Sequence, residues 1–545
     1  MNMTLINIWQ ILVSIAIIYN GENSYQLFSI GCQLEFAGKI PEAIEYYKMA
    51  KVLDPNSPEI YLSLAHASYK IRKLDDGINF ATEGISIFPN NSQLYLIIGT
   101  GYIGKGNLKQ AIKFYEKALA IEPKDTEIYA SISLLYEGMG DIKKAIVILD
   151  SMPEDLKTRE MYQRLGSLAG KLNNHKNAIE YYQKSYTMDT TNTTALIGIG
   201  AGFDIMGVRD SAIYYYEKML SQDTFNLNVA RRLVEFYSEN DQYEKMMTMT
   251  RKILDIDYYD GYARRNLGFA LYKSGMLQEA LNEFLIASGT DPRDTYSKFY
   301  VGRIFLEQGN YNAAQREILD AINIDPDFVE LWIYLGFIAI DKKDYKTAEY
   351  AFDEAAHHGG DLTQIYYLLG ITAETQNNNT NAYFYYHKAL GASPKDVASL
   401  GALANLCARI GKKDEAFTIF QQVLALDTTN AVALNYVGYT YTEQNDSLEY
   451  ALSLIDKALS IEENNGYYID SRGWVFYQMG RYEEAMAELK KASELVEDAV
   501  VLEHLGDVYL KLNDIERAKQ AYEKALILDA KNKAVKEKLL KIKGD

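Results

Sequence analysis

The chain has little of what small secreted domains and metalloproteins depend on. Its 545 residues contain only two cysteines, Cys32 and Cys407, so neither a disulfide framework nor a cysteine-based zinc site is expected. Nine prolines are few for this length, and their scarcity favours helices. Basic residues are outnumbered, with a formal net charge of −18. Such a chain is not expected to bind nucleic acid, whose phosphates require a basic face, or to spread over anionic membranes.

Long apolar runs are also missing, apart from residues 5–19, "LINIWQILVSIAIIY". This run is short for a membrane span, which needs about 20 residues, but its length suits a secretory signal. No basic residue precedes Lys39, so the usual charged start of a signal is absent. The alternatives for residues 1–23 are therefore a signal peptide, a membrane tether or a packed helix. We expect an exported or envelope-associated (periplasmic) protein, with a cytoplasmic one as the alternative.

What the sequence does have is a repeat with a period of 34 residues. The segments "LGFIAIDKKDYKTAEYAFDEAA" (335–356), "LGFALYKSGMLQEALNEFLIAS" (267–288) and "LGDVYLKLNDIERAKQAYEKAL" (505–526) align directly. Fifteen units fill residues 24–532, and they start at 24, 58, 92, 126, 159, 193, 227, 261, 295, 329, 363, 397, 431, 466 and 499. A Lys-rich tail, 533–545, follows and is expected to form a helix that caps the last unit.

Small residues recur at fixed positions in each unit. Glycine follows the first apolar residue of the motif in eleven units, as at Gly336, and alanine opens the second half of the unit in thirteen, as at Ala348. An aromatic residue such as Phe352 follows, and proline ends six units, as at Pro326. Small residues let two helices approach closely, the aromatic ring fills the space between them, and proline prevents the second helix from continuing.

This signature resembles the tetratricopeptide repeat, W-x2-L-G-x2-Y…A-x3-F…A…P. The resemblance covers nearly the whole chain. It implies an all-α protein, a right-handed superhelical solenoid of helix-turn-helix units in which each first helix lines a concave groove. It also implies a non-catalytic scaffold that binds protein or peptide partners in that groove.

Two units depart from the pattern. In residues 126–158, Pro153 should end the second helix early. In residues 227–260, bulky Val234, Met246 and Ile253 stand at the three small positions, which predicts a kink or softer packing.

Catalytic motifs are not found. No phosphate loop, nucleophile elbow or His-Glu-x-x-His helix occurs, and His357-His358 has no second pair of ligands in spacing. We therefore expect no enzyme activity, no cofactor and no metal. Cys407 is expected to be a small core residue.

One stretch of the predicted groove is rich in arginine and aromatic residues. Residues 231–316 hold eight of the sixteen arginines. Arginine beside aromatic rings is typical of binding hot spots, although these arginines could instead pair with neighbouring carboxylates. The predicted partner-binding residues are Arg231, Arg265, Phe269, Tyr272, Phe299, Arg303, Tyr334 and Phe337.

The partner predicted for this stretch is a peptide with acidic and apolar side chains. A second aromatic patch could stack on sugar rings, and it consists of Tyr439, Tyr467, Trp474 and Tyr477. Two functions follow as hypotheses: a scaffold for protein partners in bacterial envelope assembly, or a carbohydrate-associated scaffold in exopolysaccharide export or cell-wall assembly.

Overall fold

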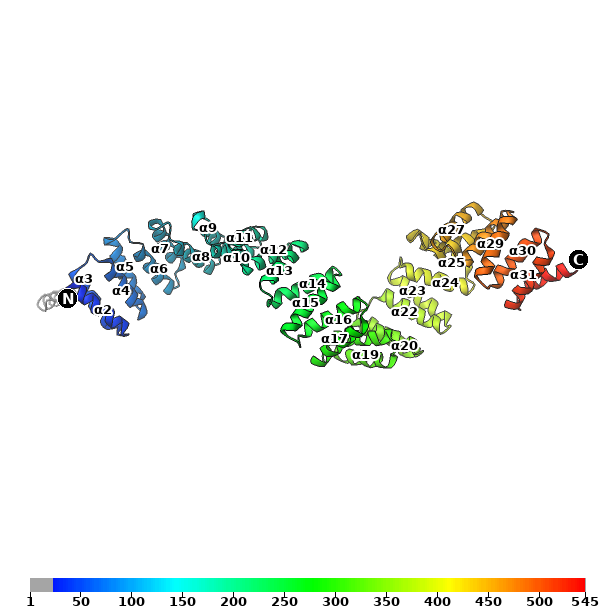
Figure 1. Ribbon diagram of the computed structural model, residues 1–545, viewed down its shortest axis with the longest axis horizontal. Coiled ribbons are helices and arrows are strands. Elements are labelled where there is room, and N and C mark those ends of the chain that lie inside the picture. Colours follow the sequence, from blue (N-terminus) through cyan, green and yellow to red (C-terminus); the bar gives the residue numbers. More distant parts are fainter. Residues whose placement is uncertain (1–22, 545) are drawn as a thin grey trace. The chain divides into compact units, whose positions relative to one another are not determined.

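The computed structural model describes residues 23–544, and every regular element among them is a helix. The chain divides into two compact parts, Met1–Ser274 and Gly275–Asp545, which we call the N-terminal and C-terminal parts. Within each part the helices follow one another in chain order as antiparallel pairs (Figure 1). This arrangement is the tandem helix-turn-helix array that the repeat predicts.

The described N-terminal part consists of the helices α2 Ser24–Phe36, α3 Ile40–Leu53, α4 Pro58–Lys70, α5 Leu74–Ile87, α6 Ser92–Gly104, α7 Leu108–Ile121, α8 Thr126–Gly138, α9 Ile142–Asp150, the 3-10 turn η1 Glu154–Leu156, α10 Arg159–Lys171, α11 His175–Met188, α12 Thr193–Ile205, α13 Arg209–Gln222, α14 Leu227–Glu239, α15 Tyr243–Ile256 and α16 Gly261–Lys273.

The described C-terminal part consists of the helices α17 Leu277–Thr290, α18 Thr295–Glu307, α19 Tyr311–Ile324, α20 Val329–Asp341, α21 Tyr345–His357, α22 Leu362–Thr375, α23 Asn379–Ala392, α24 Val397–Arg409, α25 Lys413–Leu426, α26 Ala431–Glu443, α27 Leu448–Ile461, α28 Gly466–Gln478, α29 Tyr482–Leu495, α30 Ala499–Lys511, α31 Ile515–Leu528 and α32 Lys533–Gly544.

Local sequence explains where most of these helices begin. Asp125 precedes α8, and its carboxylate accepts hydrogen bonds from the N–H groups of Glu127 and Ile128. Asp or Asn takes this capping position before many of the other helices, because a short polar side chain satisfies N–H groups that the first turn leaves unpaired. The turn inside a unit needs a left-handed residue, which Gly106 supplies at φ 74° between α6 and α7.

Most units are locked by a glycine facing a large side chain 16 residues later. Gly336 of α20 lies against Phe352 of α21, and a Cβ added at Gly336 would collide with the Phe352 ring. Gly302 faces Ile318 in the same way, so the partner is not always aromatic. Tyrosine takes the place of Phe352 in the pairs Gly31–Tyr47, Gly99–Tyr115, Gly166–Tyr182, Gly200–Tyr216, Gly370–Tyr386 and Gly506–Tyr522.

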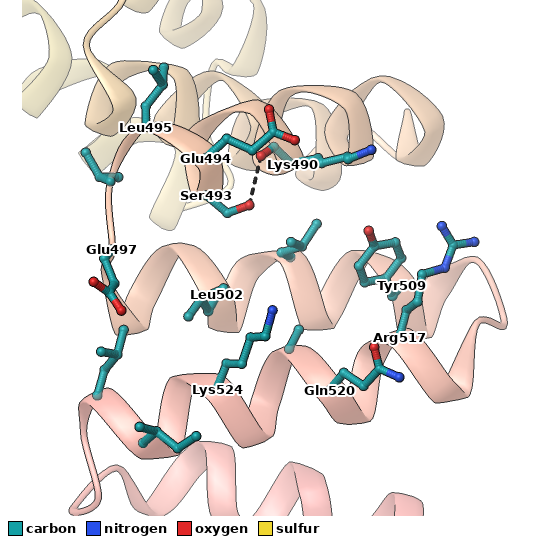
Figure 2. Close-up of a pocket in the computed structure, with 15 residues that line it drawn as sticks. Lys490, Ser493, Glu494, Leu495, Glu497, Leu502, Tyr509, Arg517, Gln520 and Lys524 are labelled. Atoms are coloured by element: carbon teal, nitrogen blue, oxygen red, sulfur yellow. Dashed lines mark hydrogen bonds between the residues drawn. The ribbon is translucent and has the colours of Figure 1, made fainter.

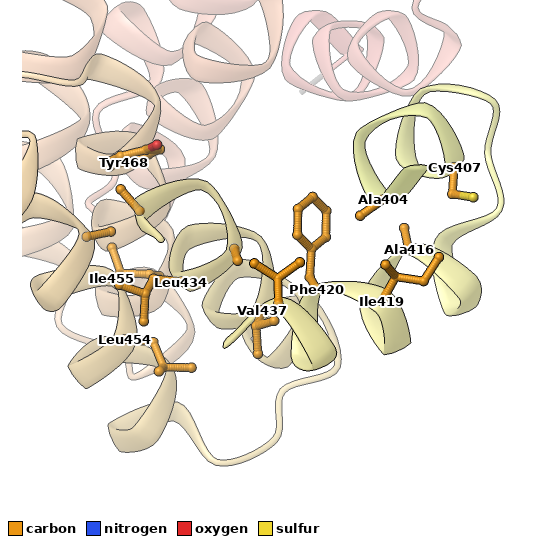
Figure 3. Packing of buried hydrophobic residues seen from close by; sticks show 14 of the residues in the cluster. Ala404, Cys407, Ala416, Ile419, Phe420, Leu434, Val437, Leu454, Ile455 and Tyr468 are labelled. Carbon is orange, nitrogen blue, oxygen red and sulfur yellow. The ribbon is translucent and has the colours of Figure 1, made fainter. Parts of the chain in front are cut away.

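A continuous apolar core joins neighbouring units of the C-terminal part. One cluster of buried side chains runs from Ala373 to Val501. Figure 3 shows part of it, with Phe420 of α25 beside Val437 of α26, and with Cys407 among alanines of α24 and α25. Cys407 is fully buried, as its position in the repeat predicts, and burial raises the pKa of its thiol to about 11.

The two units that depart from the repeat pattern also differ structurally. Helix α9 ends at Asp150, and the buried Lys157 then ties the following turn together by donating to the Asp150 carbonyl (2.9 Å) and the Glu154 carboxylate (3.0 Å). In the other unit, α14 and α15 have normal lengths, and Val234, Met246 and Ile253 are fully buried between them. These two helices pack less closely than the two full-length helices of other units within each part.

The last helix, α32, covers the end of the C-terminal core. Val535 and Leu539 are buried in the final cluster, and Lys538 bridges Glu503 (2.8 Å) and Asp507 (2.7 Å) of α30. Leu540, next to Leu539 on this helix, is 69% exposed. No helix within residues 23–544 is long and apolar enough to span a membrane. The possible tether at residues 5–19 lies outside the described residues.

Candidate functional site

The predicted groove residues of the N-terminal part lie on α14 and α16. Arg231 of α14 donates to the Asp260 carboxylate at 2.5 Å, and its guanidinium lies 5.5 Å from the centre of the Tyr262 ring. Asp260 is buried and also caps α16 through the N–H of Ala263. Arg231 is therefore held at the start of α16, by the residue that caps this helix and by a ring in its first turn.

The other three predicted residues of this part, Arg265, Phe269 and Tyr272, are half-buried on α16. Phe269 meets the Tyr243 ring edge-on at 6.2 Å, with the Lys273 ammonium 5.7 Å from its centre. The structure thus places all four predicted residues of this part on the first helices of two consecutive units.

In the C-terminal part, the predicted residues of α18 and α20 form one cluster, which we call the aromatic platform: Phe299, Arg303, Tyr334 and Phe337. Phe299 is only 6% exposed and supports Tyr334, whose ring centre is 5.0 Å away. Tyr334 meets Phe337 edge-on at 5.8 Å, and the Arg303 guanidinium lies 5.4 Å from the Tyr334 ring centre. The half-exposed members are Arg303, Tyr334 and Phe337, whereas Phe299 lies beneath them.

The surroundings of the platform fix its shape. Phe337 rests on Phe352, the ring that fills the Gly336 socket, at 6.0 Å. Arg303 also approaches Glu307, with 3.6 Å between its Nε and the carboxylate. Burial raises the pKa of the Tyr334 phenol, so this ring is neutral at physiological pH.

Trp332, two residues before Tyr334 on α20, belongs to the core and not to the platform. It is 8% exposed, and its Nε1 donates to the Pro326 carbonyl at 2.8 Å. His358 stacks on its ring at 5.8 Å and hydrogen-bonds Asp327 at 2.8 Å. The histidine pair that could have suggested a metal site thus includes one ring that packs on the tryptophan.

Ion pairs within the fold hold several of the arginines. Arg231 pairs with Asp260, and Arg232 pairs with both Asp204 and Glu235. Part of the basic charge concentrated in residues 231–316 is therefore neutralised internally. The attraction of this stretch for an acidic partner is smaller than the count of arginines suggests.

The second aromatic patch is only partly assembled. Trp474 of α28 lies between Tyr477 (4.5 Å) and His504 of α30 (4.0 Å), stacked nearly parallel to both. Its Nε1 donates to the Glu443 carboxylate at 2.8 Å, and the residue is only 9% exposed. Since rings cover both of its faces, Trp474 offers no free face to a sugar.

The remaining two residues of this patch differ from each other. Tyr439 of α26 approaches His504 at 6.4 Å, and burial followed by nearby carboxylates raises the pKa of its phenol. Tyr467 is 55% exposed and, among the described side chains, forms no ring contact with the other three. His504 was not predicted, because its place in the stack depends on contacts between two units.

His504 and Asp470 form a buried polar pair beside this stack. The His504 Nδ1 lies 3.0 Å from the Asp470 carboxylate, and both residues are 6% exposed. Burial lowers the pKa of the imidazole, but Asp470, helped by Asp507 and Glu443, raises it further, so the net pKa lies above its ordinary value. The pair belongs to the protein interior, because Trp474 and Tyr439 pack against His504.

A third feature, which the repeat pattern did not reveal, is a cleft of about 700 Å³ between α29 and α31, with α30 as its floor (Figure 2). We call it the α29–α31 cleft. It lies beside residues 496–498, the linker between the last two units. A usable signal was present in the sequence, because the unit 466–498 has 33 residues instead of 34.

Within the part of the chain that the structure describes, no three His, Cys, Asp or Glu side chains lie together as a metal site. The exposed Cys32 accepts a hydrogen bond from the Tyr47 hydroxyl at 3.5 Å.

Comparison with known families agrees with this architecture. Models described as "Tetratricopeptide repeat" match residues 102–168, 160–192, 302–361, 363–396 and 399–432, and a "Tetratricopeptide repeat-like domain" model matches residues 473–545. The chain is a tetratricopeptide-repeat protein.

Relatives share only part of their length with this chain. A TPR repeat-containing protein of Pseudomonas aeruginosa is 28% identical over 138 residues, 25% of this chain and 23% of the relative. One from Methanocaldococcus jannaschii is 32% identical over 117 residues, 21% of this chain and 20% of the relative. Among solved structures, the Naa15/Naa10 complex bound to HypK-THB contains a chain 14% identical to this one, with 96% of both chains covered and a TM-score of 0.39.

Proposed function

We propose that this protein is a non-catalytic scaffold that binds an extended or helical peptide segment of a protein partner over its first helices. The observation that supports this most is the aromatic platform. Its half-exposed rings, Tyr334 and Phe337, stand on buried Phe299 and Phe352, with Arg303 alongside. Little side-chain entropy would be lost when a partner packs on rings that are already fixed.

The platform suits a partner with apolar side chains and some acidic ones. Tyrosine and arginine dominate the energetics of many protein interfaces, because a large ring and a planar cation each contribute contact area and directed bonds. Arg303 approaches Glu307 at 3.6 Å in this geometry, so a partner carboxylate would compete with that contact. We therefore assign most of the affinity to the rings and the selectivity to the arginine.

The proposed setting is the bacterial cell envelope. The apolar residues 5–19 support export or tethering, and the scarcity of cysteine is compatible with any compartment. The carbohydrate-associated alternative depended on the second aromatic patch, in which Tyr477 and His504 cover the faces of Trp474. That covering favours the protein-binding scaffold over the carbohydrate-associated one.

Site-specific photo-crosslinking tests the proposal in intact cells. A benzophenone amino acid in place of Phe337 should form a covalent adduct with a partner protein, and Tyr334→Ala should abolish that adduct. The matched control places the same amino acid at Phe384 of α23, which is 52% exposed on a second helix, and should give no such adduct. Adducts of equal yield at both positions, or their survival in Tyr334→Ala, would overturn the proposal.

Arginine substitutions separate the contribution of α14 and α16 from that of the aromatic platform. A triple variant carries Arg231→Ala, Arg265→Ala and Arg303→Ala. If arginine contributes selectivity, the yield of the adduct formed at position 337 should fall in this variant. Arg303→Ala alone keeps the N-terminal part intact and isolates the contribution of the platform itself.

A further inference from the structure

Methionine is concentrated on one helix of the N-terminal part. The chain has 15 methionines, and three of them, Met246, Met247 and Met249, lie within four consecutive residues of α15. Met246 is fully buried, Met247 is 7% exposed and Met249 is 8% exposed. A buried thioether packs like an aliphatic side chain, but a mild oxidant converts it into a polar sulfoxide. This helix therefore contributes core side chains that oxidation can alter.

Met249 also lines a cleft between α13 and α15, which we call the α13–α15 cleft. Its volume is about 510 Å³, and Tyr237 of α14 lines it as well. A water molecule occupies about 30 Å³ in the liquid, and hydrogen peroxide is only slightly larger, so the cleft admits this oxidant. Peroxide carries no charge and is therefore not excluded by the charged side chains of the cleft, which are Glu217, Glu244, Lys245 and Lys252.

Several features make α15 easier to open than a regular second helix. The bulky residues at the three small positions of its unit lie between α14 and α15, which pack less closely than other full-length pairs. The Thr250 hydroxyl donates to the carbonyls of Met246 (2.8 Å) and Met247 (3.0 Å), and such bonds back to the helix slightly destabilise it. The turn before α15 holds Asp241 at φ 53°, a left-handed conformation that glycine adopts with less strain. Local opening that exposes the buried thioethers is therefore expected here.

A sulfoxide is less stable than a thioether inside the closed helix pair. Its oxygen is a hydrogen-bond acceptor, and burying such a group without a donor costs free energy. Water supplies that donor when α14 and α15 separate. Oxidation therefore shifts the equilibrium of this helix pair towards the open form, because the modified side chains are more stable there.

We propose that Met246, Met247 and Met249 form an oxidation-sensitive site, at which hydrogen peroxide converts the thioethers to sulfoxides and thereby opens the α14–α15 pair. In each step the lone pair on Sδ takes one oxygen atom from the peroxide. The O–O bond breaks, an S–O bond forms, and the second oxygen leaves as water with both protons, so that sulfur is oxidised and peroxide is reduced. The site does not depend on the function proposed for the aromatic platform.

Peptide mapping of the full chain during peroxide treatment tests the order of reaction. Met188 and Met206, which are 54% and 47% exposed, should oxidise first and give the rate of an open thioether. Met249 should follow, at least about tenfold faster than Met152 and Met219, because these two are 2% and 0% exposed and do not line the α13–α15 cleft. A rate for Met249 no greater than theirs would overturn the proposal.

Hydrogen exchange of the treated chain tests the structural effect. Exchange in α14 and α15 should become at least about fivefold faster in wild type after oxidation. It should return to its original rate when methionine sulfoxide reductases and a thiol reduce the sulfoxides. The variant Met246→Leu/Met247→Leu/Met249→Leu conserves side-chain volume, so it should fold and should show no such increase. The same increase in this variant, or no increase in wild type once Met249 is oxidised, would contradict the proposal.

The matched control replaces three exposed methionines of the same part, in Met139→Leu/Met188→Leu/Met206→Leu. Its α14–α15 pair should respond to peroxide as in wild type, and a response lost in this variant would assign the effect to the exposed thioethers instead.

A substitution that needs no oxidant gives an independent test. Met249→Gln places a polar group of similar length where the sulfoxide would form, so exchange in α14 and α15 should speed up without peroxide. Met249→Leu should leave exchange unchanged, and circular dichroism checks that both variants are folded. Equal exchange in the two variants would show that a polar side chain at this position does not open the helix pair.

Discussion

At the scale of single residues, the repeat is a set of close contacts between small and large side chains. Gly336 accepts the ring of Phe352, and Trp332 on the same helix packs over the turn and donates to the Pro326 carbonyl. The residues that first identify the unit are therefore the ones least available to a partner. Their half-exposed neighbours Tyr334 and Phe337 are the residues for which we propose a role in recognition.

Replacing Trp332 with alanine should destabilise the C-terminal part by about 3–5 kcal/mol, because a large buried ring is lost and a cavity remains. Trp332→Phe keeps most of the volume and loses the hydrogen bond to Pro326, so it should cost less, about 1–2 kcal/mol beyond any cavity. Urea unfolding followed by hydrogen exchange of α20 and α21 measures both. Equal effects for the two substitutions would show that packing of the indole is not what stabilises this unit.

The His504–Asp470 pair predicts a pH dependence of stability. The folded pKa of His504 lies above its ordinary value of 6.5, so the pair contributes stability that is fully present below pH 6.5. That contribution is lost as the pH rises through the folded pKa. The unfolding temperature of the C-terminal units should therefore fall as the pH rises above 6.5 in wild type.

The control for this prediction is Asp470→Asn, which removes the carboxylate that raises the pKa of His504. Its unfolding temperature should depend less on pH over the same range than that of wild type. Asp507 and Glu443 also act on His504, and they remain in this variant. A wild-type stability that rises with pH in this range would contradict the assignment.

At the scale of helices and linkers, the sequence was most informative about where elements begin and pair. Periodic glycine and alanine predict helix pairs because only small residues let two backbones approach, and that constraint acts inside a single unit. Contacts between units are set by several side chains at once. The burial of Phe299 beneath Tyr334 and the enclosure of Trp474 by His504 could not be predicted from position within a unit.

The cleft beside residues 496–498 shows a second limit of prediction from the sequence. A unit one residue short is visible in the sequence, but the length alone does not say whether a helix, an inner turn or a linker loses the residue. In residues 126–158 the second helix is shortened, whereas in residues 466–498 both helices keep their full length and the linker is shortened.

The helix pair α14–α15 should exchange its amide protons faster than the pairs before it. Bulky Val234, Met246 and Ile253 separate these helices, and looser packing lowers the free energy of local opening. Hydrogen exchange with mass spectrometry can compare peptides from α14–α15 with those from α10–α13. Equal protection in both regions would mean that the larger side chains pack without lowering the free energy of local opening.

At the scale of the whole molecule, a repeat array has no single core. Each unit is stabilised by itself and its immediate neighbours, so unfolding should be a series of local steps and not one all-or-none transition. The division of the chain into two compact parts, between Ser274 and Gly275, is consistent with this view.

A core substitution should therefore act locally. Ile132 of α8 is fully buried, and Ile132→Ala should lower stability by about 2–5 kcal/mol in its own and adjacent units. Hydrogen exchange should increase across α6–α11 and stay unchanged in the C-terminal part. An equal loss of protection along the entire chain would show that the array unfolds as one cooperative unit.

The glycine sockets also give the protein an optical signature in alkali. The hydroxyls of Tyr47, Tyr386 and Tyr522 each donate to a carboxylate at 2.6 Å, and burial together with that bond raises their pKa far above the ordinary 10. Ionisation of a phenol shifts its near-ultraviolet absorption band to longer wavelength and strengthens it. In a spectrophotometric titration these three tyrosines should stay silent until the helices around them open, so their late ionisation would report, without any label, the alkaline unfolding of the units that contain them.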